Sequence, residues 1–131
     1  MREIKFRAWL KNEKRMITNI SSIKFDINCI YYNNNQMFLY DNSMFSYGIA
    51  SFDEIELMQY TGLKDKNGVE IYEGDIVKLD EDEVCFIKWD EYDYSYRIKN
   101  KEVDDILCGF RPKDFEVIGN IYENTELLEE K

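Results

Sequence analysis

The sequence contains no histidine, a single proline and three widely spaced cysteines. Without histidine the chain lacks the most common general base and zinc ligand, which excludes Ser-His-Asp and Cys-His arrangements. Cys29, Cys85 and Cys108 form no Cys-x-x-Cys pair, which indicates free thiols in a reducing compartment. No apolar run approaches the roughly 18 residues of a membrane span. The charged start lacks a signal-peptide core. We therefore expect a cytoplasmic protein without a membrane partner.

Motifs for cofactors and metals are also missing. No glycine-rich phosphate loop occurs, and the cysteines do not provide a four-ligand zinc site. Carboxylates are dense at residues 80–83 and 90–93, and a magnesium site needs few protein ligands. Solvated acidic turns are the simpler interpretation, with a carboxylate-metal enzyme as the competing hypothesis. We predict no catalytic residue, metal or cofactor, and therefore a protein that is not an enzyme.

The composition favours β-structure. The 131 residues include ten tyrosines, eight phenylalanines and two tryptophans, and aromatic and β-branched residues are enriched in strands. Alternation predicts strands at 3–10 and 14–20, and residues 23–32 are typical of one longer strand. Residues 84–87 are apolar on both faces, which predicts a fully buried strand. The fold expected is mainly β.

The central stretch, residues 58–78, predicts a hairpin that leads into another strand. Two apolar runs flank Asp65-Lys66-Asn67-Gly68, and an Asn-Gly pair between such runs is the strongest short-range hairpin signal. Gly74 then precedes a strand at 76–79. We expect a β-rich region at 1–60 packed on a small barrel with a short C-terminal helix at 61–131, together one compact unit. Ser51-x-x-Glu54 also fits a helical capping box, although a strand from residue 54 is preferred.

Charge is unevenly distributed along the chain. Residues 1–24 hold seven basic and two acidic residues, whereas residues 53–131 hold ten basic and twenty-three acidic, and the net charge is −10. Aromatic and basic side chains on one surface are typical of nucleic-acid binding. The candidate contacts for nucleic acid or a partner are Lys5, Arg7, Trp9, Lys11 and Arg15. The acidic remainder repels phosphates and disfavours this function.

A second candidate surface is aromatic. Tyr92, Tyr94 and Tyr96 alternate, which predicts that they share one face of a strand. They either fill a barrel interior or form a protein interface, where tyrosine is enriched. Trp89 has the same two interpretations, so the candidate interface is Trp89, Tyr92, Tyr94 and Tyr96.

Three stretches of the sequence are similar to the YopX family, found largely in bacteriophages, prophages and plasmids. They are residues 2–9 (Arg-Glu-Ile-Lys-Phe-Arg-Ala-Trp), residues 58–77 around the Asn-Gly turn, and residues 116–124 (Glu-Val-Ile-Gly-Asn-Ile-Tyr-Glu-Asn). Thr125 departs from the proline common at that position in the family. The resemblance implies an SH3-like barrel in the C-terminal part and synthesis inside an infected or lysogenic bacterium. It implies no activity and no catalytic residue.

These observations leave several functions open. The preferred hypothesis is a non-enzymatic phage or prophage accessory protein that acts through protein–protein contacts as a homo-oligomer, with a host or phage protein as a further candidate partner. The basic start and acidic remainder offer complementary surfaces for such contacts. The alternatives are nucleic-acid binding through the basic strand and an acidic nucleic-acid mimic that binds a host protein.

Overall fold

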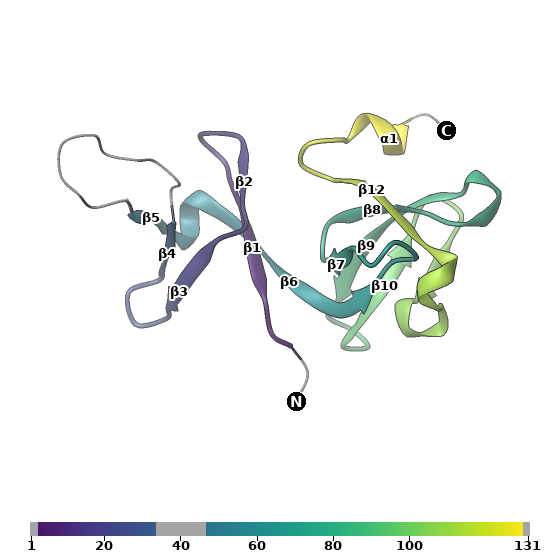
Figure 1. Ribbon diagram of the computed structural model, residues 1–131, viewed down its shortest axis with the longest axis horizontal. Coiled ribbons are helices and arrows are strands. Elements are labelled where there is room, and N and C mark those ends of the chain that lie inside the picture. The colour runs from purple at the N-terminus through teal and green to yellow at the C-terminus, as the bar shows by residue number, and fades with distance from the viewer. Residues whose placement is uncertain (1–2, 34–46, 130–131) are drawn as a thin grey trace. The chain divides into compact units, whose positions relative to one another are not determined.

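The computed structural model describes residues 3–33 and 47–129, and most of its regular structure is β-strand, as expected (Figure 1). Backbone contacts divide the chain into two units, one of residues 5–58 and one of residues 1–4 with 59–131. The division falls inside strand β6 (Ile55–Lys64), which therefore contributes to both units. Within the described ranges, no helix is long and apolar enough to cross a membrane.

The unit of residues 5–58 contains two sets of antiparallel strands. Strands β1 (Phe6–Leu10) and β2 (Arg15–Ile17) pair with each other, and β6 is the neighbour of β1 on its other side. Strands β3 (Ile20–Lys24), β4 (Cys29–Asn33) and β5 (Tyr47–Ser51) form a three-stranded sheet. The core of this unit consists of Ala8, Leu10, Ile17, Ile30, Tyr32, Ala50 and Ile55.

The single strand predicted at residues 23–32 is wrong, because β3 and β4 form a hairpin around residues 25–28. Asn28 has φ of 51°, a left-handed conformation that asparagine tolerates better than most residues. Phe25 and Ile27 are 73% and 59% exposed, so they belong to the turn and not to a buried face. Turn chemistry at Asp26-Ile27-Asn28 therefore outweighs apolar alternation here.

The sheet of β3, β4 and β5 includes a close approach of a side chain to a glycine. Tyr32 on β4 pairs with Gly48 on β5, and the tyrosine is only 5% exposed. A Cβ atom built on Gly48 would lie 2.0 Å from Cζ of Tyr32. The tyrosine ring therefore occupies the space that any other residue at position 48 would need.

The capping box at residue 51 is present, although the preferred interpretation was a strand. The carboxylate of Glu54 accepts hydrogen bonds from the Ser51 backbone N–H at 3.0 Å and hydroxyl at 3.1 Å. It closes a single 3₁₀ turn, η1 (Phe52–Glu54). These hydrogen bonds lower the pKa of Glu54. Strand β6 begins one residue later, so each interpretation describes part of the segment.

The predicted hairpin around the Asn-Gly turn is confirmed, with β6 pairing to β7 (Glu70–Tyr72). The Asp65 side chain, 3% exposed, organises the turn. Its Oδ1 accepts from the backbone N–H groups of Asn67 at 2.8 Å and Val69 at 2.9 Å. Its Oδ2 accepts from the N–H of Val117 at 2.9 Å. One buried carboxylate thus joins the hairpin to a strand near the end of the chain.

The second unit is built on a five-stranded antiparallel sheet in the order β11-β10-β9-β8-β12. These strands are β8 (Asp75–Lys78), β9 (Val84–Asp90), β10 (Ser95–Lys99), β11 (Asp104–Ile106) and β12 (Glu116–Asn120). The sheet curls over a core of Ile71, Val77, Cys85, Ile87, Ile98, Leu107 and Phe115. This arrangement is compatible with an SH3-like barrel.

Short helical turns complete this unit. They are the 3₁₀ turns η2 (Asp80–Asp82), η3 (Leu107–Gly109) and η4 (Pro112–Asp114), and helix α1 (Glu126–Glu129). The Asn124 side chain accepts from the N–H of Asn120 at 3.1 Å. A Cβ on Gly119 would lie 2.5 Å from Asn124 Oδ1, so the chain folds back directly over that glycine.

The strand buried on both faces is β8 and not residues 84–87 as predicted. Ile76 and Val77 are both 0% exposed, and they are consecutive, so they face opposite sides of the sheet. In β9 burial alternates: Cys85 and Ile87 are buried, whereas Val84 and Phe86 are half-buried. Strand β8 lies between β9 and β12. The prediction for residues 84–87 failed because Val84 and Phe86 are apolar but only half-buried, and apolar character alone does not tell half-burial from full burial.

Candidate functional site

The candidate aromatic interface lies on the hairpin formed by β9 and β10, but its tyrosines do not share one strand face as predicted. Strand β10 begins at Ser95, which pairs with Asp90, so Tyr92 and Tyr94 belong to the intervening turn. The Tyr92 N–H donates to Asp90 Oδ1 at 2.8 Å, and Tyr94 has φ of 55°. An aspartate side chain bonded to the backbone two residues on is a common turn device, and it breaks the alternation here.

The four aromatic residues divide into an anchored pair and an exposed pair. Trp89 and Tyr96 are paired across the strands and pack edge to face, with ring centroids 5.0 Å apart. Tyr96 contacts the core and Trp89 remains 38% exposed. Tyr92 and Tyr94 are 97% and 77% exposed. The barrel-interior interpretation therefore applies to Tyr96, whereas Tyr92 and Tyr94 project from the surface.

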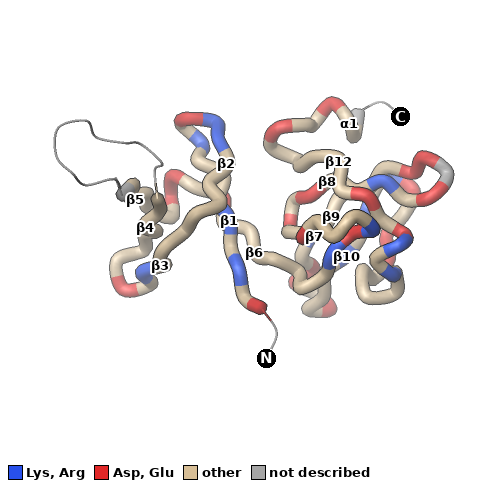
Figure 2. The backbone as a smooth tube through the Cα atoms, viewed as in Figure 1, with Lys and Arg blue, Asp and Glu red and all other residues tan. Residues whose placement is uncertain are grey.

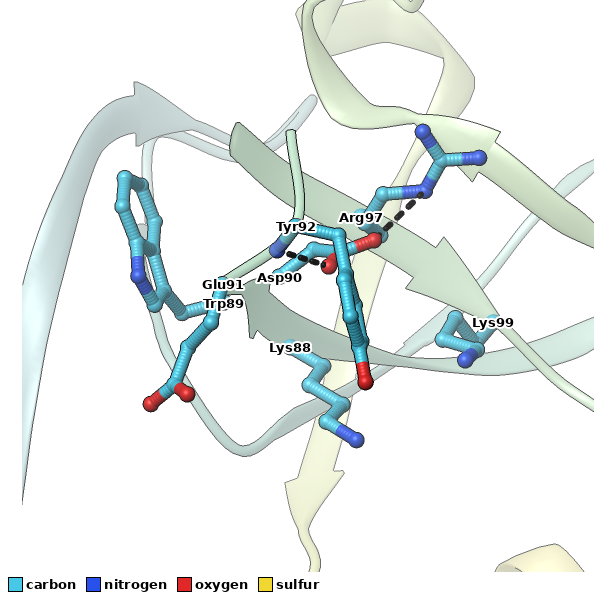
Figure 3. A pocket seen from close by; sticks show the side chains of 7 residues that line it. All are labelled: Lys88, Trp89, Asp90, Glu91, Tyr92, Arg97 and Lys99. Carbon is cyan, nitrogen blue, oxygen red and sulfur yellow. Dashed lines mark hydrogen bonds and ion pairs between the residues drawn. The ribbon is translucent and has the colours of Figure 1, made fainter. Parts of the chain in front are cut away.

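A pocket of about 390 Å³ lies on this hairpin, and Figure 3 shows the side chains around it. We call it the hairpin pocket, and it is lined by Lys88, Trp89, Asp90, Glu91, Tyr92, Arg97 and Lys99. Lys88 pairs with Arg97 across the two strands, so both side chains lie on the same face of the sheet. Lys99 is two residues beyond Arg97 and shares that face.

Arg97 is held at the edge of the hairpin pocket by three carboxylates. Its Nη1 lies 2.7 Å from Asp93 Oδ2, and its Nε lies 2.9 Å from Asp104 Oδ1 and 4.0 Å from Asp90 Oδ2. The hydrogen bond from Arg97 lowers the pKa of Asp104 and, in turn, raises the pKa of the guanidinium. The arginine side chain is 17% exposed, so it braces the turn and is not free to bind a ligand.

The two lysines of the hairpin pocket are less constrained. Lys99 Nζ lies 3.8 Å from Asp104 Oδ2, a long ion pair at a partly exposed position. The Lys88 side chain has no hydrogen-bond or ion-pair partner among the described residues, and Glu91 has none there either. The pocket therefore offers an available cation and an available anion beside an exposed aromatic ring.

The basic N-terminal candidates occupy two faces of the strand pair β1–β2. Lys5, Arg7 and Trp9 alternate with the buried Ala8 and Leu10, so they lie on the opposite face, whereas Lys11 lies in the turn after β1. Arg15 pairs with Leu10 and lies on the core side, with its guanidinium 5.6 Å from the centroid of the Tyr32 ring. The structure therefore separates Arg15 from Lys5, Arg7 and Trp9.

Acidic residues accompany the basic residues of this strand pair, as the red and blue positions along the tube near β1 and β2 show (Figure 2). Lys11 Nζ lies 3.5 Å from Glu56 Oε1 and donates to the Asp53 carbonyl at 3.2 Å. Residues 5–58 hold six basic and six acidic residues, whereas the rest of the chain holds eleven basic and twenty-one acidic. The first unit is thus neutral, and the second carries the whole net charge of −10.

The described residues contain no group of three or more metal-ligating side chains placed to hold an ion. In the acidic run at 90–93, Asp90 and Asp93 already contact Arg97. Burial raises the pKa of Glu73, whose Oε1 accepts from the Gln59 backbone N–H at 2.8 Å. That carboxylate supports the β6–β7 hairpin, so its shifted pKa has a structural explanation.

The most recognisable stretches of the sequence serve the architecture. Asp65 ties the Asn-Gly turn to β12, and Gly74 has φ of 84° at the entry to β8. The Asn120 side chain accepts from the N–H groups of Tyr122 at 3.0 Å and Glu123 at 2.9 Å. The hairpin pocket lies outside these stretches. Sequence reasoning named its aromatic residues but missed Lys88, Arg97 and Lys99, because only the strand register brings them together.

The fold and surface define a small, nearly all-β protein with a curled five-stranded sheet and a charged, aromatic hairpin. The model of the family "YopX protein" matches residues 5–129, so the chain belongs to the YopX family, as the sequence indicated. The crystal structure of protein EF1440 from Enterococcus faecalis is similar, with 31% identity and a TM-score of 0.64 over 98% of this chain and 99% of that one.

A second solved structure shows the same fold. It is the X-ray crystal structure of protein YopX from Bacillus subtilis, with 22% identity and a TM-score of 0.61 over 98% of this chain and 99% of that one. No curated protein matches the chain. The comparisons therefore provide the family and the fold.

Proposed function

We propose that this chain is a non-enzymatic accessory protein of phages or prophages that acts in the bacterial cytoplasm through protein–protein contacts, as a homo-oligomer. The observation that carries the proposal is the β9–β10 turn, where Tyr92 and Tyr94 are 97% and 77% exposed beside Trp89. Tyrosine and tryptophan are enriched at the centres of protein interfaces. Arg97 and its carboxylates hold this turn in place, so a partner meets a preorganised surface.

The distribution of structural roles supports the same proposal. The residues that make the family recognisable are occupied by internal hydrogen bonds, as for Asp65 and Asn120. A surface for partners then has to lie on side chains that make fewer internal contacts, and the β9–β10 turn provides them. Contact through such a surface needs no cofactor and no titrating catalytic group.

Mass in solution tests the oligomer directly. We expect light scattering at about 10–100 µM, a range that detects complexes held by about 5.5–7 kcal/mol, to give a discrete multimer of the 15.8 kDa chain. Replacing both Tyr92 and Tyr94 with serine is expected to shift the population towards monomer, whereas Phe25→Ser, at another exposed aromatic, is expected to leave the mass unchanged. A monomeric wild-type chain at every concentration would refute the homo-oligomer.

The basic strand β1 supports the alternative of nucleic-acid binding, because Lys5, Arg7 and Trp9 share one face. Glu56 lies against Lys11 and Glu13 lies against Arg15, which reduces the charge available to phosphates. We expect the Lys5→Glu/Arg7→Glu variant to bind a fluorescent 20-nucleotide single strand as weakly as the wild type, with little response to salt. A loss of at least tenfold in affinity on charge reversal would instead establish β1 as a nucleic-acid site.

The charge of the second unit supports a different alternative, an acidic mimic of nucleic acid that binds a host protein. A net charge of −10 resides on residues 1–4 and 59–131 while the first unit is neutral. Such a domain would attract basic, nucleic-acid-binding surfaces. A mimic is expected to compete with DNA for a host nucleic-acid-binding protein, and added salt is expected to release the protein from the purified chain. Such competition distinguishes mimicry from self-association.

A further inference from the structure

The hairpin pocket carries complementary charges that do not neutralise one another within the chain. Lys88 and Glu91 are exposed side chains without a partner among the described residues, although both line the pocket. Figure 3 shows the Glu91 and Lys88 side chains extending in different directions from the hairpin. A cation and an anion on one surface, held apart by a turn, make that surface complementary to a copy of itself.

The turn that separates these charges is fixed. Asp90 accepts from the Tyr92 N–H at 2.8 Å, and Arg97 binds Asp93 and Asp104 at 2.7 and 2.9 Å. Arg97 and Asp90 are therefore occupied internally, and they set the backbone that presents Tyr92. Lys88 and Glu91 remain the side chains of the pocket whose charges are available to a second molecule.

Electrostatics favours a second copy with this particular chemistry. Two copies of a chain whose net charge is −10 repel one another, so self-association is favoured where cations of one copy meet carboxylates of the other. In a two-fold interface the same patch serves both partners, and each contact occurs twice. A patch that holds both an available lysine and an available glutamate meets this condition without a second surface.

We propose that two copies of the chain associate about a two-fold axis through the hairpin pocket, with Lys88 of each copy against Glu91 of the other and the Tyr92 rings packed between them. This inference rests on the proposed homo-oligomer and deepens it, because it assigns the contact to one hairpin. Lys99 lines the same pocket, where its Nζ already lies 3.8 Å from Asp104 Oδ2.

The test exchanges the charges. Lys88→Glu and Glu91→Lys are each expected to weaken the dimer by at least about tenfold, because each places like charges together twice. The double variant Lys88→Glu/Glu91→Lys restores opposite charges and is expected to recover an affinity within about threefold of the wild type. Lys113→Glu and Glu126→Lys make the same charge changes at exposed positions outside the pocket, and we expect the wild-type dissociation constant for both.

Sedimentation velocity over a dilution series gives the dissociation constants, and circular dichroism melting checks that each variant is folded. A wild-type multimer that persists unchanged in both single variants would overturn the pocket contact while leaving the homo-oligomer in place. A monomeric wild type would overturn both. Failure of the double variant to recover, with both singles folded and weakened, would overturn the Lys88–Glu91 pairing.

A nucleic-acid probe distinguishes a different occupant. A fluorescent 20-nucleotide single strand is expected to show no affinity that depends on Lys88, because Asp90, Glu91 and Asp93 on the same hairpin repel phosphates. Binding that is lost in Lys88→Glu and retained in Lys113→Glu would assign the pocket to nucleic acid and overturn the self-contact.

Discussion

Replacing Asp65 with alanine is expected to lower the free energy of unfolding by about 3 kcal/mol, because it leaves backbone donors without acceptors in a buried turn. The Asp65 carboxylate is 3% exposed and accepts from the N–H groups of Asn67, Val69 and Val117. A buried donor left unsatisfied costs about 1–3 kcal/mol, and water that reaches the turn recovers part of the total. Chemical denaturation followed by tryptophan fluorescence measures the change.

The pH dependence of the same site follows from its pKa. Burial by itself raises the pKa of Asp65, but the N–H groups of Val117, Val69 and Asn67 outweigh it and bring the pKa below its ordinary value. A lowered folded-state pKa means stability that is present above the unfolded value of about 3.9 and is lost as the pH falls through the folded pKa. We expect the wild type to lose more stability than Asp65→Asn on acidification from neutral pH through this window.

Asp65→Asn and Glu126→Ala serve as controls for this prediction. The amide oxygen of asparagine can still accept from the N–H groups of Asn67 and Val69, but its NH₂ group is a donor and cannot accept from Val117. The stability of Asp65→Asn is therefore expected to fall between that of Asp65→Ala and that of the wild type. Glu126 is exposed in the first turn of α1, where its loss costs a few tenths of a kcal/mol. An Asp65→Ala variant as stable as the wild type would show that the three N–H groups find other partners.

Replacing Gly48 with alanine is expected to destabilise the first unit by about 3 kcal/mol, through a clash with a buried ring. The added Cβ would lie 2.0 Å from Cζ and 2.2 Å from Cε2 of Tyr32. The ring is 5% exposed and belongs to the core, so relief requires the tyrosine to leave its packed position. Thermal and chemical unfolding of the variant measure the loss.

A double-mutant cycle attributes the loss to this contact. In a Tyr32→Val background the ring is absent, so adding Gly48→Ala is expected to cost less than about 0.5 kcal/mol, with a coupling of 2 kcal/mol or more. Gly109→Ala is the matched control, because nothing lies within 4 Å of the position of its Cβ. Equal losses from Gly48→Ala in both backgrounds would show that the ring is not the cause.

Much of the second unit was predictable from local signals. The Asn-Gly turn has φ of 83° at Gly68 and joins β6 to β7 as expected, because turn chemistry acts within a few residues. The strand after Gly74 and the last strand before the C-terminal helix follow from the same kind of signal. Local signals failed where apolar residues stand in turns, as at Phe25 and Tyr92, since alternation does not record a left-handed residue such as Asn28 or Tyr94.

The aromatic residues of the candidate surface were predictable from the sequence, whereas the cations beside them were not, because strand register brings those cations together. Sequence reasoning identified Trp89 and Tyr92 as aromatic residues available for an interface, but placed Tyr92 in a strand with Tyr96. The cations beside them depend on which residues of β9 and β10 lie opposite one another, and Lys88 meets Arg97 only through the register set by a four-residue turn. The division of charge between a neutral and an acidic unit likewise depends on where β6 passes from one to the other.

The carboxylate of Asp65 also affects how far the edge of the five-stranded sheet is open to another strand. Strand β12 lies at the end of its sheet, and an exposed strand edge invites another strand to add to it. Here Asp65 accepts the outward N–H of Val117, and the Lys66 N–H donates to the Phe115 carbonyl at 3.2 Å. The Asn-Gly loop thus covers the start of the edge to which a strand of another molecule could otherwise add.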